Sequence, residues 1–183
     1  MADGERRVVI TGIGMVTPIG LTVQENWQNI LACKSGIGRL SKFEIPGFPV
    51  DIAGEVKAFE PADYVERKDV KKIDPFIQFA LAAARQAMDD SGLRADQANA
   101  DRIGVIIGSG QGGISMVEAN TLKAYGGRPD RVSPFLVPGA IINMASGQVA
   151  IRYGLRRPFR CSQFGPVATL QAAVDDVDGP TAV

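Results

Sequence analysis

The sequence of 183 residues contains no histidine, so it lacks the side chain most often used for acid–base catalysis and for metal binding. Cysteine is nearly absent too, with only Cys33 and Cys161. Two thiols without histidine fall short of the ligand set of a structural zinc site, so we predict no metal. They also provide no disulfide framework, which favours a reducing compartment.

An excess of charge of one sign is missing, since 20 Lys and Arg residues balance 20 Asp and Glu residues. A chain of zero net charge has no general attraction to nucleic acid or to an anionic membrane. No apolar run approaches the ~20 residues that cross a bilayer, and the polar first residues, MADGERR, are not typical of a signal peptide. We therefore expect a cytoplasmic protein with no nucleic-acid partner and no membrane association.

The sequence does contain an alternation of strand-like and helix-like segments. Residues 7–11 (RVVIT) and 102–107 (RIGVII) are short β-branched runs beside glycines, which is typical of buried strands. A further strand is expected around residues 51–57. Strands that alternate with helices predict the α/β class with a parallel or mixed sheet, and the length predicts one domain.

Two helices carry strong capping signals. A T-x-x-E capping box opens the first at Thr22, and we expect this helix to end at Gly36. Its apolar stripe consists of Val23, Trp27, Ile30 and Leu31. Asp74 caps the second helix, Pro75 is its first residue and Gly92 ends it. The alanine-rich middle of this second helix implies tight packing.

The stretch of residues 132–156 (VSPFLVPGAIINMASGQVAIRYGLR) contains the clearest buried helix. Pro134 and Pro138 predict an extended approach to it, because proline does not fit inside a helix. The next apolar residues recur with the spacing of a helix, so that they share one apolar face, made of Ile141, Met144, Ala145 and Val149. Gly154 is expected to end this helix.

A G-x-G-x-x-G pattern (Gly108, Gly110, Gly113) lies between the second strand and a helix expected from about residue 114 to 125. This spacing occurs in dinucleotide-binding loops, which also need an acidic residue about twenty positions later, after a second strand. Asp130 has the spacing but falls in a turn. Close packing of a sharp loop is therefore the favoured interpretation, and nucleotide binding is the alternative.

The segment of residues 66–72 (ERKDVKK) is dense in charge. We interpret it as a solvated face or turn, and the alternative is a docking patch for an acidic partner.

Cys161 lies close in sequence to Arg156, Arg157 and Arg160, whose positive charge would favour the nucleophilic thiolate. No histidine exists to act as its base. An inert thiol is therefore the favoured interpretation, and a catalytic nucleophile is the alternative. Cys33 ends an amphipathic helix and is expected to be structural.

Several of these segments together resemble a known family. VVITGIGMVTPIG, the helix with Trp27, RIGVIIGSGQGG and the stretch of residues 132–156 are similar, in this order, to the N-terminal half of type II elongating β-ketoacyl-[acyl-carrier-protein] synthases. The resemblance covers residues 6–156. It implies the thiolase-like layered α/β fold, of which this chain would hold the N-terminal half only, and a homodimer.

The resemblance also implies an acyltransferase activity, the decarboxylative Claisen condensation of an acyl thioester with malonyl-[acyl-carrier-protein] in fatty acid biosynthesis. In this family a cysteine takes the acyl group from acyl carrier protein, and two histidines of the C-terminal half assist the reaction. The resemblance implies no cofactor. It also implies two substrate-binding residues, since Gln111 would lie near the acyl chain and Phe135 would wall the acyl tunnel at the dimer interface.

After Arg156 the similarity to the family ends. Counted without gaps, the family's nucleophile position falls on Pro166, and Cys161 stands five residues earlier. Residues 157–183 are therefore expected to be a divergent tail, from a shifted frame or a spliced end, that is not natively folded. We expect the chain to be truncated and inactive alone. The alternatives are a non-catalytic remnant that pairs with a full-length synthase or binds carrier protein, and a nucleotide-binding module.

Overall fold

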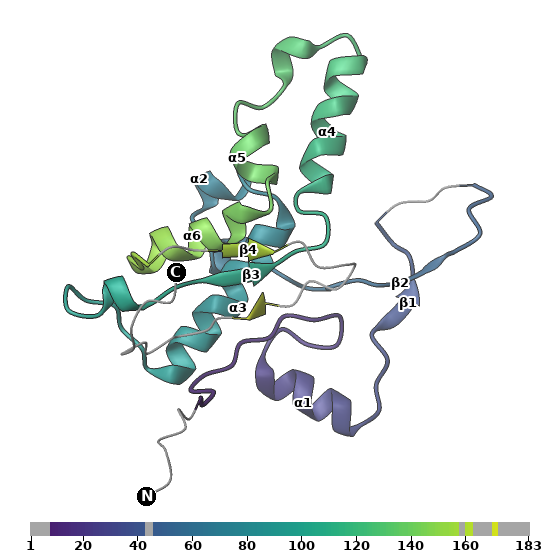
Figure 1. Ribbon diagram of the computed structural model, residues 1–183. Helices are drawn as coiled ribbons and strands as arrows, with labels where there is room; N and C mark the ends of the chain where they lie inside the picture. The colour runs from purple at the N-terminus through teal and green to yellow at the C-terminus, as the bar shows by residue number, and fades with distance from the viewer. Residues whose placement is uncertain (1–7, 43–45, 158–159, 163–169, 172–183) are drawn as a thin grey trace, which may run out of the picture.

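The computed structural model describes residues 8–42, 46–157, 160–162 and 170–171, the last two segments by their backbone alone. The α-helices of these residues are α1 (Val23–Leu31), α2 (Arg67–Val70), α3 (Pro75–Ser91), α4 (Ile114–Tyr125), α5 (Leu136–Ala140) and α6 (Asn143–Tyr153). Short 3₁₀ turns are η1 (Pro61–Asp63), η2 (Ala100–Arg102) and η3 (Pro129–Arg131). The strands are β1 (Ile37–Arg39), β2 (Ile52–Gly54), β3 (Ile106–Gly108), β4 (Arg160–Ser162) and β5 (Leu170–Gln171). In Figure 1, α3 and α6 lie at the centre, α4 and α5 project as an arm, and α1 lies at the opposite end.

The central helix is α3, and both of its ends follow the predicted signals. The Asp74 side chain accepts a hydrogen bond from the backbone N–H of Phe76, and Pro75 is the first residue. Gly92 ends the helix at φ 65°, in the left-handed region that glycine adopts without strain. The buried residues are Ile77, Gln78, Ala80, Leu81, Ala82, Ala83 and Ala84. Because the alanines are small, neighbouring segments approach α3 from more than one side.

The hydrophobic core lies between α3, α6 and β3. Its buried members are Val65, Ile77, Ala80, Leu81, Ala84, Val105, Ile107, Ala145, Val149 and Ala150. The predicted apolar face of α6 is therefore confirmed at Ala145 and Val149, whereas Ile141 is 42% exposed because it precedes the helix. Gly154 ends α6 at φ 67°, as predicted.

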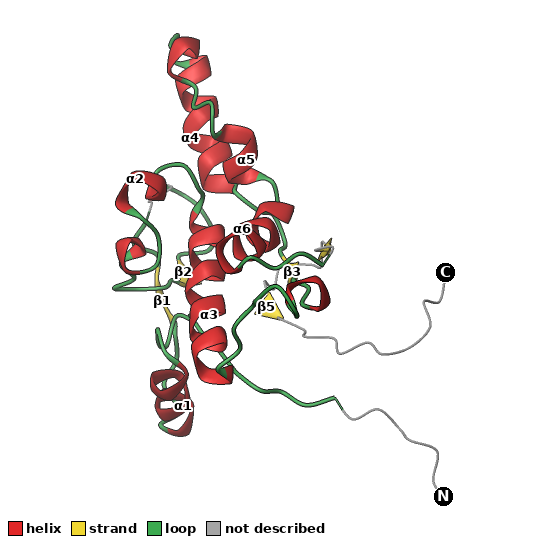
Figure 2. Cartoon of the chain, turned by 90° about the vertical axis from the view of Figure 1, so that its left-hand side faces the viewer, coloured by secondary structure: helices red, strands yellow, loops and turns green. Residues whose placement is uncertain are grey.

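A mixed three-stranded sheet has β3 in its middle, parallel to β4 and antiparallel to β5. A mixed sheet was one of the two arrangements predicted. In Figure 2, α3 and α6 lie on one side of β3 and β5. The strand predicted over residues 102–107 begins later, at Ile106, since Arg102 ends η2 and residues 103–105 belong to no helix or strand.

The buried strand predicted over residues 7–11 is wrong for the part that the structure describes. Residues 8–11 belong to no strand, and Val8 and Ile10 are 91% and 83% exposed. The following glycines pack against α3 instead, since a Cβ on Gly12 would overlap the Ala87 carbonyl oxygen and one on Gly14 the Ala83 oxygen. Among the described residues no strand lies beside this segment to complete its backbone hydrogen bonds.

The first helix, α1, starts as predicted and ends early. The Thr22 hydroxyl accepts a hydrogen bond from Glu25 N at 3.2 Å, which confirms the first half of the capping box, whereas the Glu25 carboxylate accepts from Leu21 N, one residue before the N-cap, at 2.8 Å. The helix ends at Leu31 and not at Gly36, because Cys33 has φ 52° and cannot continue it.

Two further predictions concern short elements. The strand expected at residues 51–57 is present as β2, and it pairs antiparallel with β1, which the sequence analysis did not predict. The extended approach predicted from Pro134 and Pro138 is wrong, because Pro138 lies inside α5. This helix tolerates proline because Pro138 occupies its first turn, where a backbone N–H has no partner within the helix.

Across the described ranges, no helix has both the length and the apolar character to cross a membrane.

Candidate functional site

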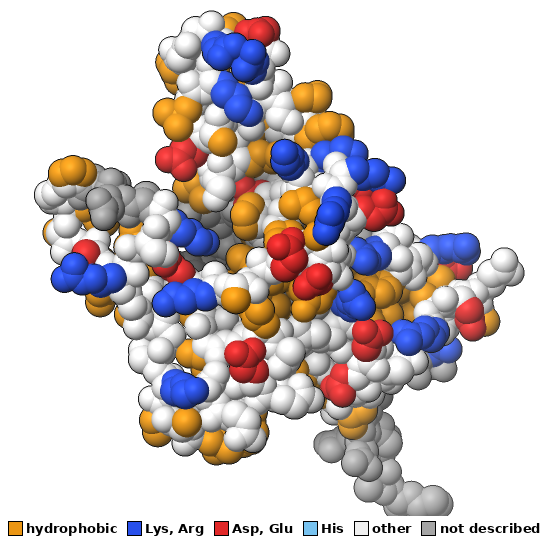
Figure 3. All heavy atoms as spheres, turned by 180° about the vertical axis from the view of Figure 1, so that it is seen from behind, with side chains coloured by type: hydrophobic (Ala, Val, Ile, Leu, Met, Phe, Trp, Pro, Cys, Tyr) orange, Lys and Arg blue, Asp and Glu red, His pale blue; other side chains and the backbone are white. Residues whose placement is uncertain are grey.

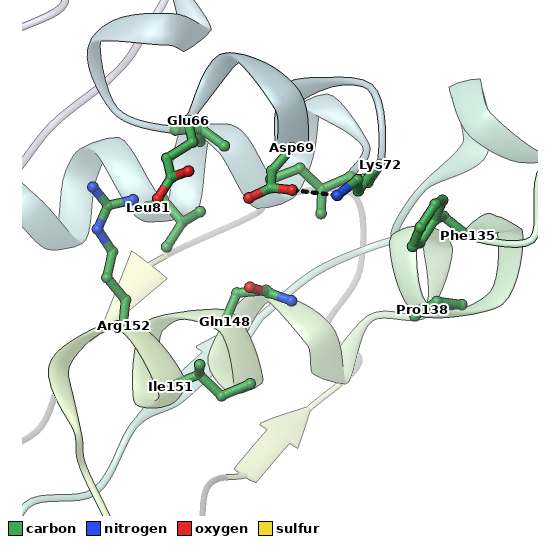
Figure 4. A pocket seen from close by; sticks show the side chains of 11 residues that line it. Glu66, Asp69, Lys72, Leu81, Phe135, Pro138, Gln148, Ile151 and Arg152 are labelled. Carbon is green, nitrogen blue, oxygen red and sulfur yellow. Dashed lines mark hydrogen bonds and ion pairs between the residues drawn. The ribbon is translucent and has the colours of Figure 1, made fainter.

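A groove of about 680 Å³ lies between α2, α3, α5 and α6 (Figure 4). Its apolar lining consists of Val65, Ile73, Leu81, Phe135, Pro138 and Ile151. Its polar lining consists of Glu66, Asp69, Lys72, Gln148 and Arg152. The charged side chains come mainly from the segment of residues 66–72, and the apolar ones come from α3, α5, α6 and the two residues Val65 and Ile73 that flank α2. A groove of this kind suits a ligand or a chain segment with both apolar and polar parts.

Lys72 joins the charged and the aromatic sides of the groove. Its ammonium nitrogen lies 2.6 Å from Asp69 Oδ1 and 5.3 Å from the centroid of the Phe135 ring. The hydrogen bond from Lys72 lowers the pKa of the Asp69 carboxyl below its usual value. The contact with the ring is a cation–π interaction, which holds the ammonium over the aromatic face.

The opposite wall of the groove comes from α6. Gln148 and Arg152 project from this helix toward α2 and α3, and Ile151 lies beside them on the same helix (Figure 4). The Arg152 guanidinium donates a hydrogen bond to the Tyr64 carbonyl oxygen, which ties α6 to the turn before α2. None of these three residues was singled out from the sequence, because nothing in the local pattern tells which exposed side of α6 faces another element.

Of the two predicted substrate-binding residues, one lines the groove and the other does not. Phe135 is the N-cap residue of α5, is 41% exposed and lines the groove. Gln111 is exposed in the loop between β3 and α4 and does not line the groove. Their binding of an acyl chain stays a prediction for both residues.

The glycine-rich loop is closely packed, and its helix end is already occupied. A Cβ on Gly113 would lie 2.5 Å from Ala140 Cα, and Gly113 N donates to the Ala140 carbonyl oxygen at 2.8 Å. At the N-terminus of α4, Met116 N donates to Asp74 Oδ2 at 2.8 Å. A carboxylate therefore fills the place where a pyrophosphate would bind in a dinucleotide site. Asp130 lies in η3, beyond the other end of α4. These observations favour the packing interpretation.

Asp74 caps two helices, and the sequence predicted only one of these caps. Its two carboxylate oxygens accept from Phe76 N, at 3.4 Å, and from Met116 N, so one side chain caps both α3 and α4. Burial raises the pKa of Asp74 above its usual value, against the opposite effect of these two donors. The second cap had no signal in the sequence, because Met116 is 42 positions away.

The structure describes the side chain of one cysteine and only the backbone of the other. Cys33 is exposed and free. Cys161 has a described backbone only, in β4 opposite Ile107 of β3. Pro166, the predicted position of the family nucleophile, lies outside the described residues. Among the side chains that the structure describes, no group of three His, Cys, Asp or Glu residues could hold a metal ion.

Two groups of neighbouring basic side chains are exposed, one at α2 and one at η3. Arg67, Lys68 and Lys71 are exposed on and beside α2, and within the described residues Arg67 and Lys71 have no ion-pair partner. Arg128 and Arg131 are exposed at η3, and Figure 3 shows Lys and Arg side chains gathered at the end of the arm.

Known structures define the class of fold. The ishigamide ketosynthase/chain length factor has a TM-score of 0.73 and 30% sequence identity, and covers 88% of this chain and 40% of its own. A β-ketoacyl synthase from Burkholderia phymatum STM815 has a TM-score of 0.68 at 22% identity, over 88% of this chain and 40% of its own. The fold is thus the thiolase-like α/β fold of ketosynthases, in the part that corresponds to the N-terminal domain.

The family follows from the sequence comparisons. The profile described as "Beta-ketoacyl synthase, N-terminal domain" matches residues 5–162, and the chain belongs to this family. It is 49% identical over 154 residues to 3-oxoacyl-[acyl-carrier-protein] synthase 2 of Coxiella burnetii and 46% identical over 154 residues to the Vibrio harveyi protein of the same name. These matches cover 84% of this chain and 37% of the relatives' length. The predicted resemblance is therefore confirmed, and the boundary after Arg156 stays a prediction.

Proposed function

We propose that this chain carries the N-terminal part of a 3-oxoacyl-[acyl-carrier-protein] synthase, which condenses an acyl thioester with malonyl-[acyl-carrier-protein] by a decarboxylative Claisen reaction in fatty acid biosynthesis. The observation that carries the proposal is the identity of 49% over 154 residues to a protein of that name. The groove supports it, because a lining of both apolar and polar side chains suits an acyl chain that ends in a thioester.

Phe135 and Gln111 are the acyl-binding residues of this proposal. The exposed Phe135 ring lies at the groove, where it can limit the room available to an apolar chain. Gln111 stands in the loop after β3, where it would contact the substrate from outside the groove. The reaction requires no cofactor.

The proposed partner is acyl carrier protein, and it would dock on the segment of residues 66–72. Arg67 and Lys71 are free to pair with acidic groups of a partner, because no described residue forms an ion pair with them. A solved ketosynthase complex with an acyl-carrier protein, 20% identical to this chain with a TM-score of 0.66, has the same fold. We also propose a homodimer and a cytoplasmic location.

This chain by itself would bind acyl carrier protein but would not catalyse the condensation. Acyl transfer requires a positioned thiolate, and the family's nucleophile position falls on Pro166. The sequence has no histidine to assist decarboxylation or to stabilise the oxyanion. This observation favours the second candidate function for the chain alone, a non-catalytic unit that binds carrier protein or pairs with a full-length synthase.

Titration of the purified chain with acyl carrier protein tests the proposal. We expect saturable binding that weakens with salt, and about tenfold weaker binding for the double variant Arg67→Glu, Lys71→Glu. Lys123→Glu on α4 is the matched control, because it reverses the same charge on another exposed helix position. Absence of binding, or an equal loss in the control variant, would contradict the proposed docking surface.

A further inference from the structure

Asn120 is the buried residue of a helix whose other side chains are exposed or half-buried. It lies in α4 and is 3% exposed. Its Nδ2 donates to the Met116 carbonyl oxygen at 2.8 Å, one turn earlier in the same helix. Its Oδ1 accepts from Ser133 N at 2.7 Å. The side chain thus connects α4 to the segment that returns toward α5, thirteen positions later.

Ser133 continues this connection to Phe135. The Ser133 hydroxyl accepts a hydrogen bond from Phe135 N at 3.1 Å, and its carbonyl oxygen accepts from Leu136 N at 3.0 Å. These bonds fix the backbone at the start of α5, from which the Phe135 ring extends into the groove and meets Lys72. A continuous set of hydrogen bonds therefore runs from Asn120 to the residue whose ring lines the groove.

We propose that Asn120 is the positioning residue for Phe135. By holding Ser133, it sets where the ring stands in the groove and how much room the ring leaves there. Asparagine suits this place because one amide supplies both the donor for Met116 O and the acceptor for Ser133 N. The consequence for acyl-chain length rests on the proposed function of Phe135, whereas the positioning itself does not.

The Lys72 side chain reports the position of the ring. Because its ammonium lies over the Phe135 ring, ring-current shifts should mark the Lys72 ε-methylene protons in an NMR spectrum of the chain. Phe135→Leu supplies the reference without the ring. We expect Asn120→Ala to move these signals toward the reference and to speed amide exchange at Ser133 about tenfold, as the loss of one hydrogen bond predicts.

Two further variants separate positioning from general stability. Asn26→Ala is the matched control, because Asn26 is another fully buried helical asparagine, hydrogen-bonded around α1, and its loss should leave the Lys72 signals in place. Ser133→Ala breaks the connection at its second step and should reproduce the shift, which keeps the test decisive if Asn120→Ala does not fold. Unchanged Lys72 signals in folded Asn120→Ala or in Ser133→Ala, or an equal shift in Asn26→Ala, would overturn the proposal.

A binding measurement distinguishes this inference from the proposed function. Wild type and Ser133→Ala are compared for affinity toward short- and long-chain acyl carrier proteins. A changed preference together with the Lys72 shift supports both proposals. The Lys72 shift with an unchanged preference supports the positioning by Asn120 and removes Phe135 from the acyl site.

Discussion

Asp74 links three helices, α3, α4 and α5. One carboxylate caps α3 through Phe76 N and α4 through Met116 N, and Asp74 N in turn donates to the Gly139 carbonyl oxygen of α5 at 3.1 Å. We predict that Asp74→Ala lowers the free energy of unfolding by roughly 2–3 kcal/mol, since one cap is lost and a second helix keeps an unpaired N–H. Urea unfolding measures this. Thr22→Ala, which removes one cap, should cost only ~1 kcal/mol, and equal losses would contradict the double role.

The same carboxyl group predicts a pH dependence. Burial raises the native pKa of Asp74 above its ordinary value of 3.8, so the folded state holds the proton more tightly than the unfolded state does. Stability from this group is therefore greatest at low pH and falls as pH rises through the native pKa. We expect wild type to lose stability relative to Asp74→Asn as pH increases above this ordinary value. A difference in the free energy of unfolding between the two proteins that stays constant with pH, or that grows in favour of wild type, would contradict the raised pKa.

Single residues differ in how far the sequence could predict them. The caps at Thr22 and Asp74 were predictable, because a helix N-terminus is satisfied by side chains next to it in sequence. The second contact of Asp74 and the relation of Lys72 to Phe135 were not, since both join distant segments. Phe135 was identified through the family resemblance and not through any local pattern.

Two glycines show how packing between elements decides the effect of one methyl group. A Cβ on Gly14 would overlap the Ala83 carbonyl of α3, whereas one on Gly147 inside α6 would meet only Met144 Sδ at 3.7 Å. We predict that Gly14→Ala destabilises the chain by about 1–3 kcal/mol through overpacking. Gly147→Ala should stabilise it by up to about 1 kcal/mol, because alanine has the higher helix propensity. Chemical denaturation of both variants checks this, and a neutral Gly14→Ala would contradict the close approach.

Helices were predicted better than strands for a physical reason. The helices α3, α4 and α6 are present at the expected places, and for α3 and α6 the buried face could be predicted from the spacing of apolar residues along the chain. A strand is defined by a partner that can lie anywhere in the chain. The segment of residues 8–11 has strand-like residues without such a partner among the described residues, and β1 formed where only β2 had been expected.

At the scale of the whole molecule, large apolar side chains remain on the surface. Trp27 and Leu31 of α1 are 57% and 61% exposed, and Figure 3 shows hydrophobic side chains gathered at that end. Val8 and Ile10, in the segment before α1, are also exposed. Apolar side chains gathered on a surface, as at α1, are typical of faces that another polypeptide segment covers. The chain spans 37% of the length of its curated relatives, whose remaining residues are available for that role in those proteins.

The most direct test of the account is a condensation assay on the purified chain with acyl and malonyl carrier proteins. We predict binding of carrier protein without turnover, because the chain has no histidine and, in the alignment without gaps that the proposed function assumes, the family's nucleophile position falls on Pro166. In enzymes where this has been measured, removal of a single hydrogen-bond donor to the oxyanion raises the activation free energy by about 2.7–4 kcal/mol. The expected result is no β-ketoacyl product above a control without protein, beside a full-length relative that is active. Product that depends on the chain and disappears in Cys161→Ser would contradict it.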